Sequence, residues 1–182
     1  MKPDVASTTE FVTTALEPAI GRDWSVRAGQ LDWSIEYTLE HIAAALSKYT
    51  LYLASRSSES IAVRIVSRRD ASQQERLDAI VSLGGALANV ARATPPDVRA
   101  FHAIGPLDAE AYVALGSLEA LVHGWDVASG LGLEYNPPDD LAQPIITRLI
   151  PSREPTWQAL LDHTRRETRD DSWKVLPDLR PG

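Results

Sequence analysis

Residues 117–132 read SLEALVHGWDVASGLG, and the apolar residues of this stretch recur at the spacing of an α-helix. Leu118, Val122 and Trp125 fall at the centre of one apolar stripe, which predicts that this face is turned toward a protein core. Three further segments of the chain show the same periodicity over similar lengths. The sequence therefore predicts an all-α protein with four long amphipathic helices.

Caps and breakers set the expected boundaries of these helices. The expected helices span about residues 8–20, 34–55, 72–93, 108–130 and 139–150, with a further short helix after Pro155. Residues 61–67, IAVRIVS, alternate in a way that fits either a short strand or an irregular segment. Four long helices with short links are typical of an antiparallel four-helix bundle. The two short C-terminal helices would then pack on the outside or the end of that bundle.

Length and composition limit the classes of protein. A chain of 182 residues favours a single domain (1–182), here a bundle at about 8–165 and a polar tail at 166–182. The net charge of −7 argues against a nucleic-acid partner. The sequence has no apolar run long enough for a membrane helix and no secretory signal, so we expect a cytoplasmic protein. It has no cysteine, which excludes disulfides and cysteine zinc sites.

Three polar residues share one flank of the fourth predicted helix. Glu119, His123 and Asp126 fall within about 60° of one another on a helical wheel. A glutamate and a histidine four residues apart lie over the same patch and can both donate a lone pair to one divalent metal ion. The same spacing also occurs on solvated helix faces, so this pair alone does not define a site.

His41 supplies a third candidate ligand from the second predicted helix. It lies one step off the apolar stripe, and adjacent helices of a bundle could bring it opposite Glu119 and His123. Two imidazoles and one carboxylate would leave other coordination positions open, as catalytic metal sites do. We expect ordinary roles for the other two histidines, with His102 in a loop and His163 exposed on a charged helix.

Two separated segments carry a family resemblance. DWSVRAGQLDWSIEYTLEHIAAALSKY, followed by EALVHGWDVASGLG, resembles the N-terminal domain of mycothiol-dependent maleylpyruvate isomerases. That domain belongs to the DinB-like superfamily of metal-binding four-helix bundles, and the resemblance covers about residues 8–165. The residues that carry it are Trp33-Ser34, His41, Glu119, His123 and Asp126.

The resemblance implies a ligand set and a cofactor. It implies that His41, Glu119 and His123 bind a divalent metal ion, usually zinc, with nickel or manganese as alternatives. Asp126 would orient an imidazole or a bound water and not bind the ion directly. Related proteins use a low-molecular-weight thiol such as mycothiol, which fits a chain that has no thiol of its own. The expected partners are therefore a small thiol and a small electrophilic substrate.

The expected function is that of a metal- and thiol-dependent transferase or isomerase. Maleylpyruvate isomerases carry a second domain, whereas only residues 166–182 follow the expected bundle here, so we do not carry over their reaction. One alternative is a metal-dependent hydrolase with Asp126 or Tyr112 as general base, and another is a non-catalytic metal-binding stress protein. Related bundles often form homodimers, but no exposed apolar stripe in the sequence selects that state.

Overall fold

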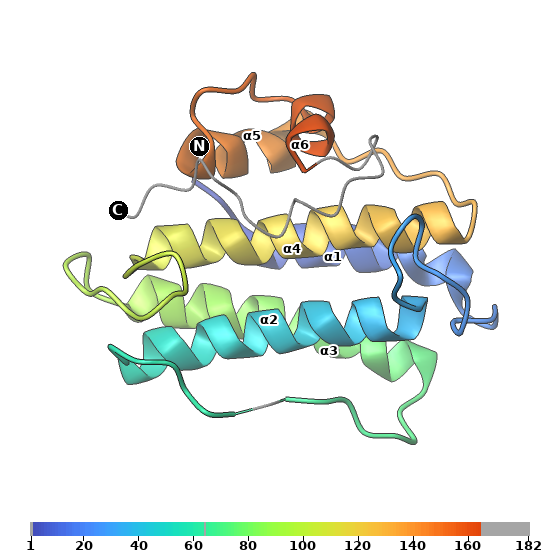
Figure 1. Ribbon diagram of the computed structural model, residues 1–182, viewed down its shortest axis with the longest axis horizontal. Helices are drawn as coiled ribbons and strands as arrows, with labels where there is room; N and C mark the ends of the chain where they lie inside the picture. The colour runs from blue at the N-terminus through green and yellow to red at the C-terminus, as the bar shows by residue number, and fades with distance from the viewer. Residues whose placement is uncertain (1, 64, 165–182) are drawn as a thin grey trace.

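A computed structural model describes residues 2–63 and 65–164 of the chain (Figure 1). Its elements are α1 (Val5–Leu16), a 3-10 helix (Glu17–Ala19), α2 (Ile35–Ser55), α3 (Gln73–Ala93), α4 (Ala109–Gly130), α5 (Asp139–Leu149) and α6 (Trp157–His163). In these ranges the only β-pairing consists of two isolated bridges. The all-helical prediction is confirmed, and the described part of 61–67 is irregular and not a strand. The expected tail at 166–182 lies outside the described residues.

Short polar side chains begin three of the long helices. Ser34, Ser72 and Asp108 each accept a hydrogen bond from the backbone N–H three residues on. Such caps satisfy N–H groups that have no partner within the helix. The predicted starts of α2, α3 and α4 are therefore confirmed to within one residue.

The first helix differs from its predicted range at both ends. It begins at Val5 because the side chain of Asp4 caps it, accepting hydrogen bonds from the two N–H groups of Ala6 and Ser7. It ends at Leu16, and the chain then tightens into the 3-10 turn that contains Pro18. Proline has no N–H with which to continue an α-helical ladder.

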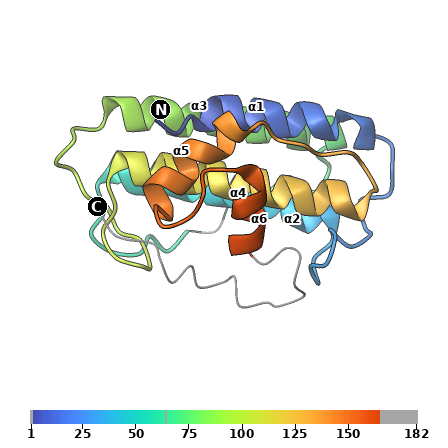
Figure 2. The same cartoon turned by 90° about the horizontal axis from the view of Figure 1, so that it is seen from above.

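The four long helices form a bundle in which α4 is adjacent to α2, as predicted (Figures 1 and 2). The helices α1 and α2 each pack against both α3 and α4. The short helix α5 packs on α4, and α6 packs on α5, so both lie outside the bundle as expected. Because α1, α2 and α5 surround it, α4 is buried along most of its length, and not along one stripe only.

The helix directions correct the prediction of a fully antiparallel bundle. An ion pair of 2.7 Å between Glu36 and Arg76 joins the first turns of α2 and α3, so these two neighbours are parallel. The described parts of the link, 56–63 and 65–72, lie along the length of the bundle, which makes this direction possible (Figure 1). The helix α4 runs antiparallel to α2, and this pairing aligns the polar residues of both helices.

The described residues contain no helix that combines the length and the apolar character needed to cross a membrane.

Candidate metal centre

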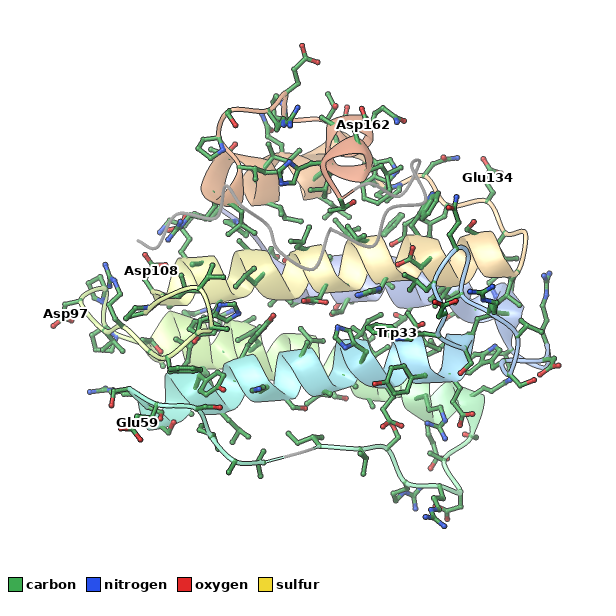
Figure 3. The ribbon with its side chains drawn as sticks, viewed as in Figure 1. Trp33, Glu59, Asp97, Asp108, Glu134 and Asp162 are labelled. Carbon is green, nitrogen blue, oxygen red and sulfur yellow. The ribbon has the colours of Figure 1, made fainter. Side chains whose placement is uncertain are left out.

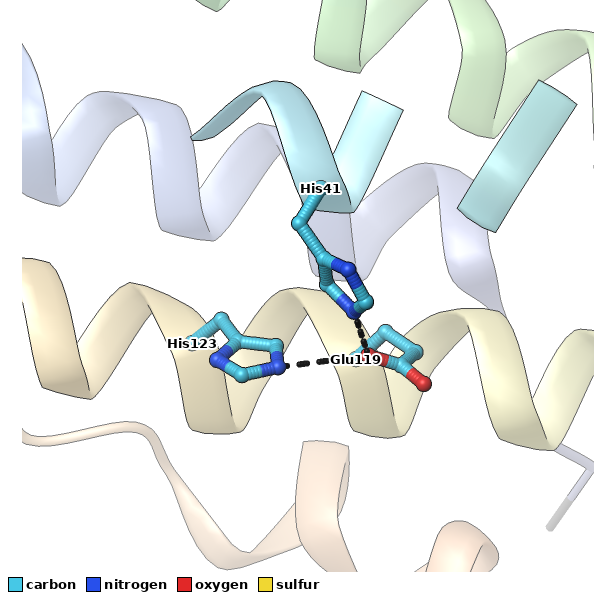
Figure 4. A group of neighbouring side chains, drawn as sticks. All are labelled: His41, Glu119 and His123. Atoms are coloured by element: carbon cyan, nitrogen blue, oxygen red, sulfur yellow. Dashed lines mark hydrogen bonds and ion pairs between the residues drawn. The ribbon is translucent and has the colours of Figure 1, made fainter. Parts of the chain in front are cut away.

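Three side chains from α2 and α4 meet at one point between the helices (Figure 4). The Nε2 atom of His41 lies 3.1 Å from Oε2 of Glu119, and the Nε2 atom of His123 lies 3.4 Å from the same oxygen. All three candidate ligand atoms lie within 4.8 Å of one another. The structure therefore brings together the three residues that the sequence predicted, and this group could hold a metal ion.

The three side chains differ in their exposure to solvent. His123 is buried, with 1% of its side chain exposed, whereas Glu119 is 21% and His41 32% exposed. The cluster therefore has a buried side at His123 and an accessible side at His41. A small molecule could approach the accessible side without any opening of the bundle.

Asp126 lies behind His123, on the side away from the other two ligands. Its Oδ2 atom is 2.9 Å from Nδ1 of His123, and its side chain is buried. A carboxylate in this position holds the proton on Nδ1 and leaves Nε2 to bind a metal, which is the role expected for Asp126. Burial lowers the pKa of His123, but hydrogen bonds with Asp126 and Glu119 outweigh it and raise the pKa above its ordinary value.

Glu119 is held as a carboxylate by its two histidine neighbours. Burial opposes its charged form, but hydrogen bonds from His123 and His41, together with their charges, hold the pKa of Glu119 far below its usual range. Its second oxygen, Oε1, lies 3.4 Å from the hydroxyl of Tyr49 on α2. Because a carboxylate can only accept, Tyr49 is the donor in this contact.

Trp33 comes from the loop before α2, and its side chain lies between α2 and α4 (Figure 3). Its ring centroid lies 5.0 Å from that of His41 and 5.8 Å from that of His123. The ring is half-buried and packs against the core of the bundle as well as against the two imidazoles. Trp33 directly precedes Ser34, the N-cap of α2, so the start of this helix places its ring near His41.

A cavity of about 200 Å³ adjoins the accessible face of His41. It lies between the outer face of α2 and the link that follows α2, and Val63 and Ile65 contribute from the link. Glu40 and Lys48 place charges of opposite sign on its wall. Glu40 is half-buried and lines this cavity.

The remaining candidates lie outside the three-residue cluster. The hydroxyl of Tyr112 donates to the backbone carbonyl of Phe101, and burial raises the pKa of this tyrosine. His102 lies in a loop, as expected, and packs against the rings of Tyr49 and Tyr112. His163 is half-buried in α6, which corrects the expectation of an exposed side chain.

The arrangement provides two imidazole nitrogens and one carboxylate oxygen around a partly accessible point. The sequence did not single out Tyr49, because this residue fits the apolar stripe of α2. It follows His41 by about two helical turns, so the two side chains lie on neighbouring faces of α2.

Comparisons with models of protein families, with curated proteins and with solved structures found no match to this chain.

Proposed function

We propose that this protein binds one divalent metal ion through His41, Glu119 and His123, and uses a small thiol to transform a small electrophile by transfer or isomerisation. The observation that carries the metal proposal is the convergence of these three side chains from two helices. The thiol proposal is supported by the absence of cysteine from the chain and by the resemblance to mycothiol-dependent isomerases.

The donor atoms suit zinc in type, and two of their separations are close to those around a zinc ion. Donors around a tetrahedral zinc ion with bonds of 2.0–2.1 Å are separated by about 3.4 Å. Both Nε2 atoms lie close to this distance from Oε2 of Glu119, at 3.1 and 3.4 Å. Imidazole and carboxylate also bind nickel and manganese.

The protein's own residues have distinct tasks in this proposal. His123 and Asp126 form the fixed, buried side of the centre, while His41 and Glu119 border the side that a substrate would approach. When bound, a zinc ion lowers the pKa of a thiol beside it, which makes the thiol nucleophilic at neutral pH. Trp33 shields the imidazoles from solvent on one side and limits the space in which a reactant is held.

Neither Asp126 nor Tyr112, the two candidate general bases of the hydrolase alternative, faces the candidate metal position with a free group. Asp126 contacts Nδ1 of His123, on the opposite side of the ring from the candidate metal position. The hydroxyl of Tyr112 is engaged by a backbone carbonyl. These positions favour an external thiol over a water activated by either residue.

The test is calorimetric titration of the zinc-loaded protein with mycothiol in two buffers of different ionisation enthalpy. A thiol that binds as the thiolate releases a proton, so the measured heat should differ between the buffers. The matched controls are the metal-free protein and the same protein titrated with a thiol-blocked mycothiol, neither of which should show this difference. Heat that is independent of the buffer, or equal binding without metal, would contradict the thiol proposal. Turnover of esters or amides without thiol would favour the hydrolase. If the protein neither binds the thiol nor turns over such substrates, the non-catalytic alternative is favoured.

A further inference from the structure

The two oxygens of Glu119 have different surroundings. Oε2 faces the Nε2 atoms of His41 and His123, at 3.1 and 3.4 Å. Oε1 faces away from them and lies 3.4 Å from the hydroxyl of Tyr49. One oxygen is therefore directed to the candidate metal position, and the other to a hydrogen-bond donor from the neighbouring helix.

The ring of Tyr49 is buried and packs against two other aromatic rings. The residue is 8% exposed, and its ring packs against those of Tyr112 at 5.5 Å and His102 at 5.9 Å. A phenol that is buried normally has a hydrogen-bond partner, because a buried polar group without one costs about 1–3 kcal/mol. Glu119 provides that partner, and the packed ring keeps the hydroxyl from turning away.

The contact also links the two helices that form the site. Tyr49 follows His41 on α2 by about two turns, so one helix carries both a candidate ligand and the donor to a second ligand. Asp126 has the corresponding position behind His123 on α4. A bound carboxylate that is hydrogen-bonded through its other oxygen keeps its orientation toward the ion.

We propose that Tyr49 is a positioning residue of the metal centre, which holds Oε1 of Glu119 so that the carboxylate binds the ion through Oε2 alone. This inference rests on the proposed metal site. It adds that Glu119 is a one-oxygen ligand, which leaves coordination positions open for a reactant on the side of His41.

The test compares Tyr49→Phe with Tyr112→Phe in the full chain. Each change removes one phenolic hydroxyl and keeps the aromatic ring, but only the hydroxyl of Tyr49 contacts Glu119. Zinc affinity is measured by competition with a chelator of known affinity. We expect Tyr49→Phe to weaken zinc binding roughly 10- to 100-fold, as losses of ligand-supporting contacts do. Tyr112→Phe should leave zinc affinity within about twofold of the wild type, a change much smaller than the loss expected for Tyr49→Phe.

The outcomes separate this inference from the proposed function. If the wild type binds no zinc after reconstitution, the metal proposal itself is wrong. If the wild type binds zinc and both variants bind it equally well, only the role of Tyr49 is wrong. The visible spectrum of the cobalt-loaded protein gives a second readout, and it should change in Tyr49→Phe but not in Tyr112→Phe.

A measurement on the wild type covers the case in which Tyr49→Phe does not fold. Infrared difference spectra of zinc-loaded and metal-free protein, labelled with ¹³C at glutamate carboxylates, report how the carboxylate binds. A wide separation between its two stretching bands, typical of binding through one oxygen, is the expected result. The narrow separation of a two-oxygen ligand would overturn the inference.

Discussion

The α1–α3 and α2–α4 interfaces are both antiparallel helix pairs of the same bundle, but they use polar residues in opposite ways. In the α1–α3 interface, the hydroxyl of Thr9 donates to carbonyls within α1, at 3.0 Å from Val5 and 2.9 Å from Ala6. Its polar group is thus satisfied inside one helix, and the side chain packs directly on Gly84. The two helices are therefore closely packed at this point.

The polar groups of the α2–α4 interface depend on one another across the two helices. His41 reaches Glu119 at 3.1 Å, and Tyr49 reaches the same carboxylate at 3.4 Å. Partly buried charges of this kind cost free energy of desolvation that apolar residues in the same positions would not. This difference supports our proposal that the α2–α4 interface binds a metal ion, whereas the α1–α3 interface serves stability.

The largest effect is expected from His123→Ala, which removes a ligand from the α2–α4 interface. Loss of a residue that only supports a ligand typically weakens metal binding by up to about 100-fold. Loss of the ligand itself should therefore lower zinc affinity by more than about 100-fold. The control is His163→Ala, which changes a histidine outside the three-residue cluster and should leave zinc affinity unchanged. Chelator competition measures both. Equal losses in the two variants would show that the cluster is not the site.

Gly84→Ala tests the other interface. A Cβ atom at this position would lie 2.2 Å from Oγ1 of Thr9, so the Thr9 side chain or one of the helices must shift. We expect a loss of about 1–3 kcal/mol in the free energy of unfolding. Gly85→Ala is the matched control, because a Cβ atom there meets nothing within 4 Å, and the change should stabilise the helix by up to about 1 kcal/mol. Urea denaturation measures both, and zinc affinity should be retained in each variant.

Asp126→Ala tests whether the carboxylate behind His123 contributes to the proposed metal site. Loss of the carboxylate that orients His123 should weaken zinc binding roughly 10- to 100-fold. Asp126→Asn keeps an oxygen that can accept from Nδ1, so its zinc affinity should fall between those of Asp126→Ala and the wild type. An unchanged affinity in Asp126→Ala would remove this residue from the site.

The smallest effect is expected at the start of α4, far along the helix from the ligands. Burial opposes the charged form of Asp108, but its hydrogen bond from the N–H of Ala111 and the charge of Arg148 lower its pKa. Because the folded pKa lies below the unfolded one, the stabilisation is present above the unfolded pKa and is lost as the pH falls through the folded pKa. Asp108→Asn should therefore cost up to about 1 kcal/mol at pH 7 and less in acid.

Denaturation at neutral and acidic pH measures the effect of Asp108→Asn, with the exposed Asp97→Asn as the control for loss of one negative charge. Zinc affinity should be unchanged in both variants. A loss of stability that is the same at both pH values would show that the charge of Asp108 is not its cause.

The local features of this protein could be predicted from its sequence. Helix starts at Ser34 and Ser72 depend on hydrogen bonds within one turn, and the Glu119–His123 pair depends only on helical spacing. His41 was added because adjacent helices of a bundle bring distant residues together. The structure confirms that these side chains meet.

The remaining features depend on tertiary packing. Apolar periodicity carries no information about helix direction, so the parallel pairing of α2 and α3 was not predicted. Tyr49 has the same spacing as core residues of α2, and only its hydroxyl contact with Glu119 distinguishes it. Periodicity cannot separate a tyrosine that fills the core from one that supports a ligand.

The most direct test of the central claim is anomalous diffraction at the zinc absorption edge from crystals of the zinc-loaded protein. The account predicts one strong peak per chain, within bonding distance of Nε2 of His41, an oxygen of Glu119 and Nε2 of His123, or about 2.0–2.2 Å. Crystals of zinc-treated His123→Ala protein should lack this peak. A peak bound by other residues, or none at this position in reconstituted wild-type protein, would contradict the account.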